Sequence, residues 1–289
     1  MIALVILNYK TYIDSYELMK SIYNNELGDE ITVFFVDNET NEYELSKLKS
    51  AVIDFGLDIH FLPQKDNLGF ARGMNVGIDK ARELKFEFVV CSNNDVLIPS
   101  TFSFSELVAP YQDDNNIAWI GPQITNLDSV TQNPLYLSDP FGSASRKKLI
   151  KSIFLLPFFG RSIFILRGLL KHYFSRTRVE FKVENEAVVD SIESGRVYSL
   201  HGSFFVLTPA YFSHYKNMDN NTFLYYEELI LSKKLENRGL ICYLNASIEV
   251  IHKEDSSTDA CFGSGSLRKT IFVLKENYRS LVYYLNNYI

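Results

Sequence analysis

The stretch Phe86-Glu87-Phe88-Val89-Val90-Cys91-Ser92-Asn93-Asn94-Asp95 decides the fold. Its first six residues are mainly β-branched or aromatic, which predicts a buried strand. The strand then ends in two amides and a carboxylate, a polar cluster that packing alone does not require. Ligands of open α/β sheets bind at the carboxyl ends of the strands, so this cluster predicts a site for a metal and a phosphate.

Two other predicted strands end in the same way. Asn8-Tyr9 follows the apolar run 2–7, and Asp37-Asn38 follows the apolar run 31–36. Turn chemistry would explain any one of these polar pairs. Three of them on separate strands favour a nucleotide site at the carboxyl edge of the sheet.

Strands and helices alternate through residues 1–125, which predicts an α/β fold with a mostly parallel, doubly wound, Rossmann-like sheet. The expected strands are 2–7, 31–36, 57–62, 86–91 and 117–120. The expected helices are 15–24 and 68–84, and Asn67 is the predicted N-cap of the second.

The rest of the chain divides into three parts. Residues 126–195 read as a loop followed by a basic, helical, amphipathic insertion. Residues 196–266 begin with a strand that contains His201-Gly202-Ser203 and continue with a helix from Glu227 to Asn237, strands at 240–244 and 248–251, and a loop from 255 to 266. Residues 267–289 predict an amphipathic C-terminal helix. With the nucleotide-binding half, 1–125, these parts form one expected domain.

Composition limits the class of protein. The 289 residues are 46% hydrophobic and 22% charged, typical of a globular protein. The three cysteines (Cys91, Cys242 and Cys261) lack metal-site spacing and predict a reducing compartment. The N-terminus reads as a first strand, and no run approaches the ~20 apolar residues of a membrane span. We therefore expect a cytoplasmic protein, either free or peripheral on the inner face of the cell membrane.

The charge is distributed unevenly. The segment 146–178 contains nine Lys or Arg and no Asp or Glu, whereas the whole chain has a net charge of −6. Interleaved Phe, Leu and Ile favour an interfacial element that binds an anionic membrane surface. A pair of packed helices with a solvated basic face is the alternative. Nucleic acid is not an expected partner, because the chain is acidic overall and has no nucleic-acid module.

Several polar clusters suggest chemistry, and each has a simpler interpretation. Asp95 offers an oxygen ligand to Mn²⁺ or Mg²⁺, and His252, at the end of an apolar strand, offers a nitrogen. Alone, these residues also fit an Asx turn and a structural histidine. Glu227 and Glu228 open a helix, where the macrodipole favours carboxylates, but an aromatic approach would also suit a general base. Arg72 lies in a glycine-containing helix opening that could approach a phosphate.

Seven short motifs follow one another in a recognisable order: Asn8-Tyr9, Val36-Asp37-Asn38, the run 67–75, Asn93-Asn94-Asp95, the run 201–205, the run 223–228, and the run 251–257 (Ile-His-Lys-x-x-Ser-Ser). In this order they resemble the family 2 glycosyltransferases of GT-A fold. The likeness is strongest to bacterial rhamnosyl- and galactosyltransferase-like enzymes of surface polysaccharide synthesis, and it covers most of residues 1–260.

The resemblance implies a role for each motif. Glu228 would be the catalytic base with Glu227 beside it, and Asp95 and His252 would bind the metal, Mn²⁺ or Mg²⁺. The donor, a UDP-hexose or dTDP-rhamnose, would be bound by a larger set: Asn8, Tyr9, Asp37, Asn67, Gly69, Arg72, Asn75, Asn93, Asn94, His201 and Gly202. The enzyme would be inverting, and the acceptor would be a glycan or a lipid-linked oligosaccharide.

The chain departs from the family pattern at two positions. Asn93 replaces the first carboxylate of the D-x-D motif, and Ile230 replaces the acid that follows the catalytic pair. These departures leave open a non-catalytic GT-A-fold partner of an active transferase. A sugar nucleotidyltransferase is a weaker alternative, because no glycine-rich basic signature follows the first strand.

Overall fold

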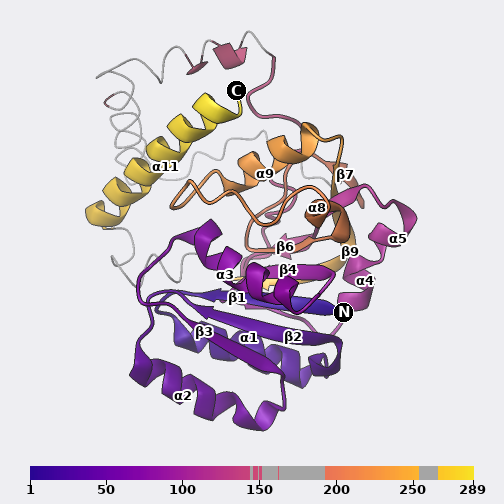
Figure 1. The fold of residues 1–289 in the computed structure, drawn as a ribbon, viewed down its shortest axis with the longest axis vertical. Coiled ribbons are helices and arrows are strands. Elements are labelled where there is room, and N and C mark those ends of the chain that lie inside the picture. Colours follow the sequence, from indigo (N-terminus) through magenta and orange to yellow (C-terminus); the bar gives the residue numbers. More distant parts are fainter. Residues whose placement is uncertain (144–145, 149, 152–161, 163–192, 254–265) are drawn as a thin grey trace.

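In the part of the chain that the structure describes, one nine-stranded sheet organises the fold (Figure 1). The computed structural model describes residues 1–143, 146–148, 150–151, 162, 193–253 and 266–289. The strands are β1 (Ile2–Asn8), β2 (Ile31–Asp37), β3 (Ile59–Pro63), β4 (Phe88–Asn93), β5 (Val96–Leu97), β6 (Ile117–Thr125), β7 (Gly195–Val197), β8 (Phe204–Leu207) and β9 (Ile241–His252). Their order is β3-β2-β1-β4-β8-β6-β9-β5, and β7 pairs with β9.

Helices cover both faces of the sheet. They are α1 (Tyr12–Asn24), α2 (Glu42–Val52), α3 (Phe70–Glu83), α4 (Phe104–Val108), α5 (Pro110–Asp113), α8 (Pro209–Phe212), α9 (Glu227–Glu236) and α11 (Leu267–Asn287), with short 3-10 turns at Gly28–Glu30 and Ile53–Phe55. One buried cluster joins the sheet to α1, α2 and α4, and a second joins it to α3, α8 and α9. The architecture is therefore three-layered, as an α/β fold requires.

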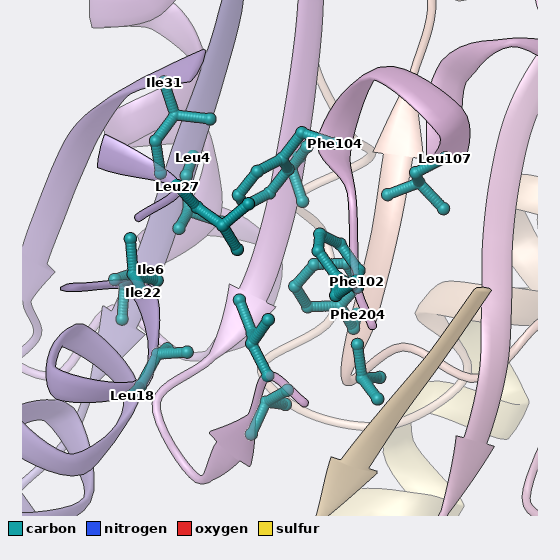
Figure 2. Close-up of a cluster of buried hydrophobic side chains, with 14 of the residues drawn as sticks. Leu4, Ile6, Leu18, Ile22, Leu27, Ile31, Phe102, Phe104, Leu107 and Phe204 are labelled. Atoms are coloured by element: carbon teal, nitrogen blue, oxygen red, sulfur yellow. The ribbon is translucent and has the colours of Figure 1, made fainter. Parts of the chain in front are cut away.

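Strand β1 lies in the middle of this arrangement and is buried on both faces. Leu4 and Ile6 point into the cluster with α1, while Ala3 and Val5 point into the cluster with α3. Figure 2 shows the first of these clusters, in which side chains of β1 and α1 lie beside the aromatic rings of Phe102, Phe104 and Phe204. Burial on both faces explains the continuous apolar run of this strand.

The sheet combines a parallel half with antiparallel strands. β3, β2, β1 and β4 pair in parallel, and β8 runs antiparallel to both β4 and β6. β5 begins just after Asp95 and pairs antiparallel with the end of β9, where Val96 lies opposite His252. The expected α/β class is confirmed. The pairing of β5 with β9 brings Asp95 and His252 together, two predicted site residues that lie 157 positions apart in the sequence.

Several local predictions differ from the structure. Residues 201–203, which were expected in a strand, lie in the loop between β7 and β8. Helix α2 was not predicted, because its charged sequence buries only three residues, Leu45, Leu48 and Val52. The two short strands expected at 240–244 and 248–251 are one strand, β9, whose pairing with β6 shifts register after Asn245. The N-cap of α3 is Gly69 and not Asn67, because the chain enters the helix at a φ of 82°.

Most of the basic segment 146–178 and most of the loop 255–266 lie outside the described residues. Lys147, at the start of the basic segment, forms an ion pair with Asp139. Helix α11 lies where the sequence predicts the C-terminal helix. Among the described helices, none has the length and apolar character needed to cross a bilayer.

Candidate functional site

The parallel register aligns the predicted polar strand ends on one edge. Asn8 pairs with Asp37, and Leu7 pairs with Asn93. The predicted convergence of three strand ends is therefore present in the fold. Tyr9 follows on the same edge, partly buried, with the Lys10 ammonium 4.9 Å from its ring centroid.

A hydrogen-bond network ties these strand ends together. Asn8 Nδ2 donates to Asp37 Oδ1 at 2.7 Å, and Asn94 Nδ2 donates to Asn8 Oδ1 at 2.9 Å. The Tyr12 hydroxyl donates to Asp37 Oδ2 at 2.7 Å. Burial raises the pKa of Asp37, and the hydrogen bonds from Tyr12 and Asn8 oppose that rise. Both oxygens of this buried carboxyl are engaged, so the network fixes its orientation, and further contacts depend on its remaining lone pairs.

The loop before α3 is built around two amides. Asn38 Nδ2 donates to Asn67 Oδ1 at 3.0 Å and to the carbonyl of Gly69 at 3.2 Å. Asn67 Oδ1 also accepts the amide of Gly69 at 2.9 Å. Asn67 therefore shapes the turn into α3 from within the loop.

The start of α3 contacts the segment 218–223, which leads towards α9. Phe70 N donates to the carbonyl of Phe223 at 2.9 Å, and a Cβ on Gly69 would lie 2.3 Å from that same oxygen. Arg72 is exposed, and its Nε donates to the carbonyl of Asn220 at 2.8 Å. Asn75 is buried and exchanges two hydrogen bonds with the backbone of Met218, both of 2.9 Å. The run 67–75, which was predicted to bind the donor, thus also contacts the segment 218–223 that precedes Glu227 and Glu228.

Asp95 and His252 form the candidate metal centre. His252 Nε2 lies 3.3 Å from Asp95 Oδ1, and the two side chains are 8% and 7% exposed. Asp95 Oδ1 is buried and makes no hydrogen bond to any described residue. The two atoms lie within ion-pair distance without the alignment of a hydrogen bond, and both are of types that bind divalent cations.

The other ring nitrogen of His252, Nδ1, contacts the side chain of Gln132. The distance from Nδ1 to Gln132 Oε1 is 2.9 Å. With the carboxamide oxygen accepting, the proton sits on Nδ1 and the Nε2 lone pair faces Asp95, as in protein metal sites. Among the described residues, no group of three or more His, Cys, Asp or Glu side chains converges as a metal site. A cation on Asp95 and His252 would therefore take its other ligands from a diphosphate and water.

His201 lies next to this pair. Its ring centroid is 5.3 Å from that of His252, and its Nδ1 is 2.9 Å from Ser203 Oγ. Burial and the nearby His252 lower the pKa of His201 to about 4. His201 is therefore neutral at physiological pH and can accept or donate one hydrogen bond without adding charge.

The two glutamates at the start of α9 have different environments. Glu227 is 5% exposed and accepts a hydrogen bond from Thr222 Oγ1 at 3.2 Å, whereas Glu228 is partly exposed. Burial and the charge of Glu228 raise the pKa of Glu227 to about 8. Burial also raises the pKa of Glu228, and the backbone of Gly202 opposes that rise. Burial therefore disfavours ionisation of both carboxyls, and their titrations are coupled because the two groups are neighbours.

One loop links the candidate metal centre to the candidate base. His201 contacts His252, and a Cβ on the next residue, Gly202, would lie 2.6 Å from Glu228 Oε1. Ser203 accepts the backbone amide of Asn93 at 2.7 Å. The resemblance placed His201 and Gly202 with the donor-binding residues. In the structure these residues border the candidate metal centre and the candidate base.

The polar residues around the site that were not predicted include Tyr12, Gln132 and Asn133. Asn133 Oδ1 accepts the amide of His201 at 2.8 Å, so residues 132 and 133 support both histidines. No local pattern marks these residues, because each partner lies on a distant element.

Comparison with known proteins supports the resemblance to family 2 glycosyltransferases. The family model described as Glycosyl transferase family 2 matches residues 4–174. Comparison with curated protein sequences gave no significant match. Among solved structures, the crystal structure of GalNAc-T7 with UDP, GalNAc and Mn²⁺ is 14% identical with a TM-score of 0.54, and the match covers 98% of this chain and 49% of that chain.

A second similar structure is the mannosyltransferase PcManGT from Pyrobaculum calidifontis in complex with GDP-Man and Mn²⁺. It is 10% identical with a TM-score of 0.52, and the match covers 99% of this chain and 70% of that one. At these identities the likeness shows the fold alone, and the predicted GT-A fold is confirmed. The chain spans about half the length of the GalNAc-T7 chain.

Proposed function

Because the chain belongs to glycosyl transferase family 2, we propose that it transfers a sugar from a nucleoside-diphosphate donor to a hydroxyl group of a glycan. The proposed donor is a UDP-hexose or dTDP-rhamnose. One observation supports this function above the others: the loop 201–203 contacts both His252 and Glu228, at the edge where Asn8 and Asp37 lie. A donor phosphate site and a base for the acceptor must be neighbours in such an enzyme.

Glu228 is the proposed general base. It is more exposed than Glu227, and it lies beside Gly202 in the loop that contacts His252. The acceptor oxygen forms a bond to the anomeric carbon while the bond from that carbon to the diphosphate oxygen breaks. The acceptor proton passes to Glu228, and the nucleoside diphosphate leaves. Direct displacement of this kind inverts the anomeric centre.

Asp95 and His252 are the proposed ligands of a divalent cation, Mn²⁺ or Mg²⁺. When bound, the cation neutralises the charge that develops on the diphosphate leaving group. The fit rests on the buried Oδ1 of Asp95, which has no hydrogen-bond partner among the described residues, and on the nearby Nε2 of His252. The similar structures of GalNAc-T7 and PcManGT contain Mn²⁺ with UDP and with GDP-Man, respectively, which supports the same use here.

The other predicted residues are proposed to surround the donor. Asp37, oriented by Asn8, would contact the nucleoside beside Tyr9. Ribose, phosphate and sugar would meet a further set: Asn67, Gly69, Arg72, Asn75, Asn93, Asn94, His201 and Gly202. The exposed guanidinium of Arg72 is the basic member of this set.

The acceptor and the cellular setting are proposals from the sequence. A lipid-linked oligosaccharide in surface polysaccharide assembly would match a cytoplasmic enzyme attached to the inner face of the membrane through residues 146–178. Such a protein would co-sediment with anionic vesicles at low salt and dissociate at high salt. Sedimentation that does not depend on lipid charge would contradict this proposal.

The variant Glu228→Gln tests the proposed chemistry. We expect binding of UDP with Mn²⁺ to be retained and turnover to fall by about 10²–10⁴-fold, the usual contribution of a general base. Glu236→Gln, an exposed change on the same helix, is the matched control and should keep full activity. Near-normal turnover by Glu228→Gln would refute the assignment of the base.

A second candidate function follows from Asn93 and Ile230. Both replace acidic residues of the family pattern, and Ile230 is 1% exposed in an apolar cluster. A non-catalytic partner of an active transferase would bind the nucleotide and show no turnover with any donor. Measurement of donor turnover by the wild-type chain therefore separates the two functions.

A further inference from the structure

Helix α11 packs against the segment 219–226, which leads directly into Glu227 and Glu228. Figure 1 shows α11, in yellow, near α9. Hydrogen bonds and ring contacts join the helix to this segment. Through them the helix can affect the geometry of the site as well as the stability of the fold.

Hydrogen bonds attach α11 and the residue after it to both ends of this segment. The hydroxyls of Tyr283 and Tyr288 both donate to the carboxylate of Asp219, at distances of 3.0 and 2.5 Å to Oδ2. Ser280 Oγ donates to the carbonyl of Leu224 at 2.7 Å. Asp219 and Leu224 are therefore both held from the C-terminal end of the chain.

Aromatic contacts continue the attachment to the residue before Glu227. Tyr284 is fully buried, and its ring centroid lies 5.9 Å from that of Tyr226 and 5.9 Å from that of Tyr288. The same apolar cluster includes Leu229 and Ile230 of α9. Helix α11 thus contacts the chain on both sides of the two glutamates.

The segment between these contacts has a strained backbone. Tyr225 and Tyr226 have φ values of 72° and 71°, in the left-handed region that residues with a side chain rarely adopt. Such conformations persist only where surrounding contacts enforce them, and they concentrate at functional sites. Here the two strained residues come immediately before Glu227, so their conformation decides where α9 begins and where Glu228 points.

We infer that α11 is a positioning element for Glu228: it holds the strained turn 225–226 through Ser280, Tyr284 and the pairing of Tyr283 and Tyr288 with Asp219. This inference rests on the proposed role of Glu228. The residues of α11 are positioning residues, because they act through the turn and not on the reacting atoms. Loss of these contacts lets the turn relax and moves the carboxylate away from the acceptor hydroxyl.

The test uses the full chain with Ser280→Ala, Tyr288→Phe and the double variant. Asn287→Ala is the matched control, because the Asn287 side chain, as far as the described residues go, bonds to the carbonyl of Tyr283 within the helix. We expect kcat of the double variant to fall by about 10–100-fold, the effect of misplacing a catalytic group by about 1 Å. KM for the donor and the Kd of UDP with Mn²⁺ should change by less than about twofold, because the substitutions leave the contacts that bind the donor in the ground state unchanged.

Hydrogen–deuterium exchange provides a readout that does not depend on turnover. Amides of residues 219–228 should exchange faster in the double variant than in Asn287→Ala, at a temperature where both remain folded. An unchanged kcat with unchanged exchange would overturn the inference, as would a fall in kcat matched by an equal loss of UDP binding. If the wild-type chain lacked turnover, or Glu228→Gln kept it, the proposed function would fail and the inference with it. In that case, faster exchange in the double variant would show that α11 only stabilises the turn.

Discussion

Replacing Gly202 with alanine should impair catalysis while leaving the fold almost intact. The added Cβ would lie 2.6 Å from Glu228 Oε1, whereas ordinary contacts begin near 3.4 Å, so the carboxylate must retreat by about 0.8 Å. The clash involves the end of a flexible side chain, which can rotate at little cost in stability. A displacement near 1 Å of a catalytic group lowers the rate by up to about 10²-fold, equivalent to about 2.7 kcal/mol in the activation free energy.

The assay compares kcat, donor KM and thermal midpoint for Gly202→Ala and for Gly195→Ala. The control adds the same methyl group at a position where nothing lies within 4 Å, so it should behave as wild type. A double-mutant cycle with Glu228→Gln sharpens the test. If Gly202→Ala acts through Glu228, it should reduce turnover little further in the Glu228→Gln background. An additive loss, or a kcat for Gly202→Ala within about twofold of wild type, would refute this reasoning.

Three further predictions concern metal binding, pH and the turn before α3. Gln132→Leu should weaken Mn²⁺ binding by about 10–100-fold in calorimetry, because His252 loses the partner of its Nδ1; unchanged affinity would contradict this. Glu227 keeps its proton to a higher pH in the folded state (pKa about 8) than in the unfolded state (about 4.5), so its contribution to stability is complete below pH 4.5 and lost above pH 8. Urea unfolding of Glu227→Gln between these values should therefore show less loss of stability with rising pH than wild type, and parallel curves would refute it. Gly69→Ala should lower the free energy of unfolding by about 1–3 kcal/mol or more, since its φ is 82° and the Phe223 carbonyl would lie 2.3 Å from the new Cβ; an unchanged urea midpoint would contradict it.

The sequence predicts the parallel half of the sheet well because each of its central strands is marked by its own run of residues, without reference to distant contacts. Strands β1, β2 and β4 are apolar runs buried on both faces, and each ends in polar residues at the same edge. The position of Asp95 at that edge follows from the strand alone. Residue chemistry suggested its meeting with His252 and the resemblance implied it. No sequence pattern shows the pairing of β5 with β9, which joins residues that are distant in the chain.

The errors have the same origin. Asn67 has a residue type suited to an N-cap, but its side chain is used by Asn38 and by the amide of Gly69 inside the loop. The support of His252 by Gln132 spans 120 positions and leaves no periodic or compositional pattern. Propensity identifies what a residue can do locally, while tertiary contacts decide which of those roles it has.

The replacement of the first D-x-D carboxylate by Asn93 lowers the negative charge at the candidate metal centre. Within the described part of the chain, Asp95 is the carboxylate that contacts His252 at the candidate metal centre, and the nearby His201 is neutral. A second buried carboxylate would add repulsion that only a bound cation could offset, whereas one carboxylate and one imidazole can stay buried without it. Affinity for the cation should then depend strongly on the negative charge of the diphosphate. Calorimetry should show weak Mn²⁺ binding by the chain alone and much tighter binding with UDP present, and equal affinity in both conditions would show that the protein residues suffice by themselves.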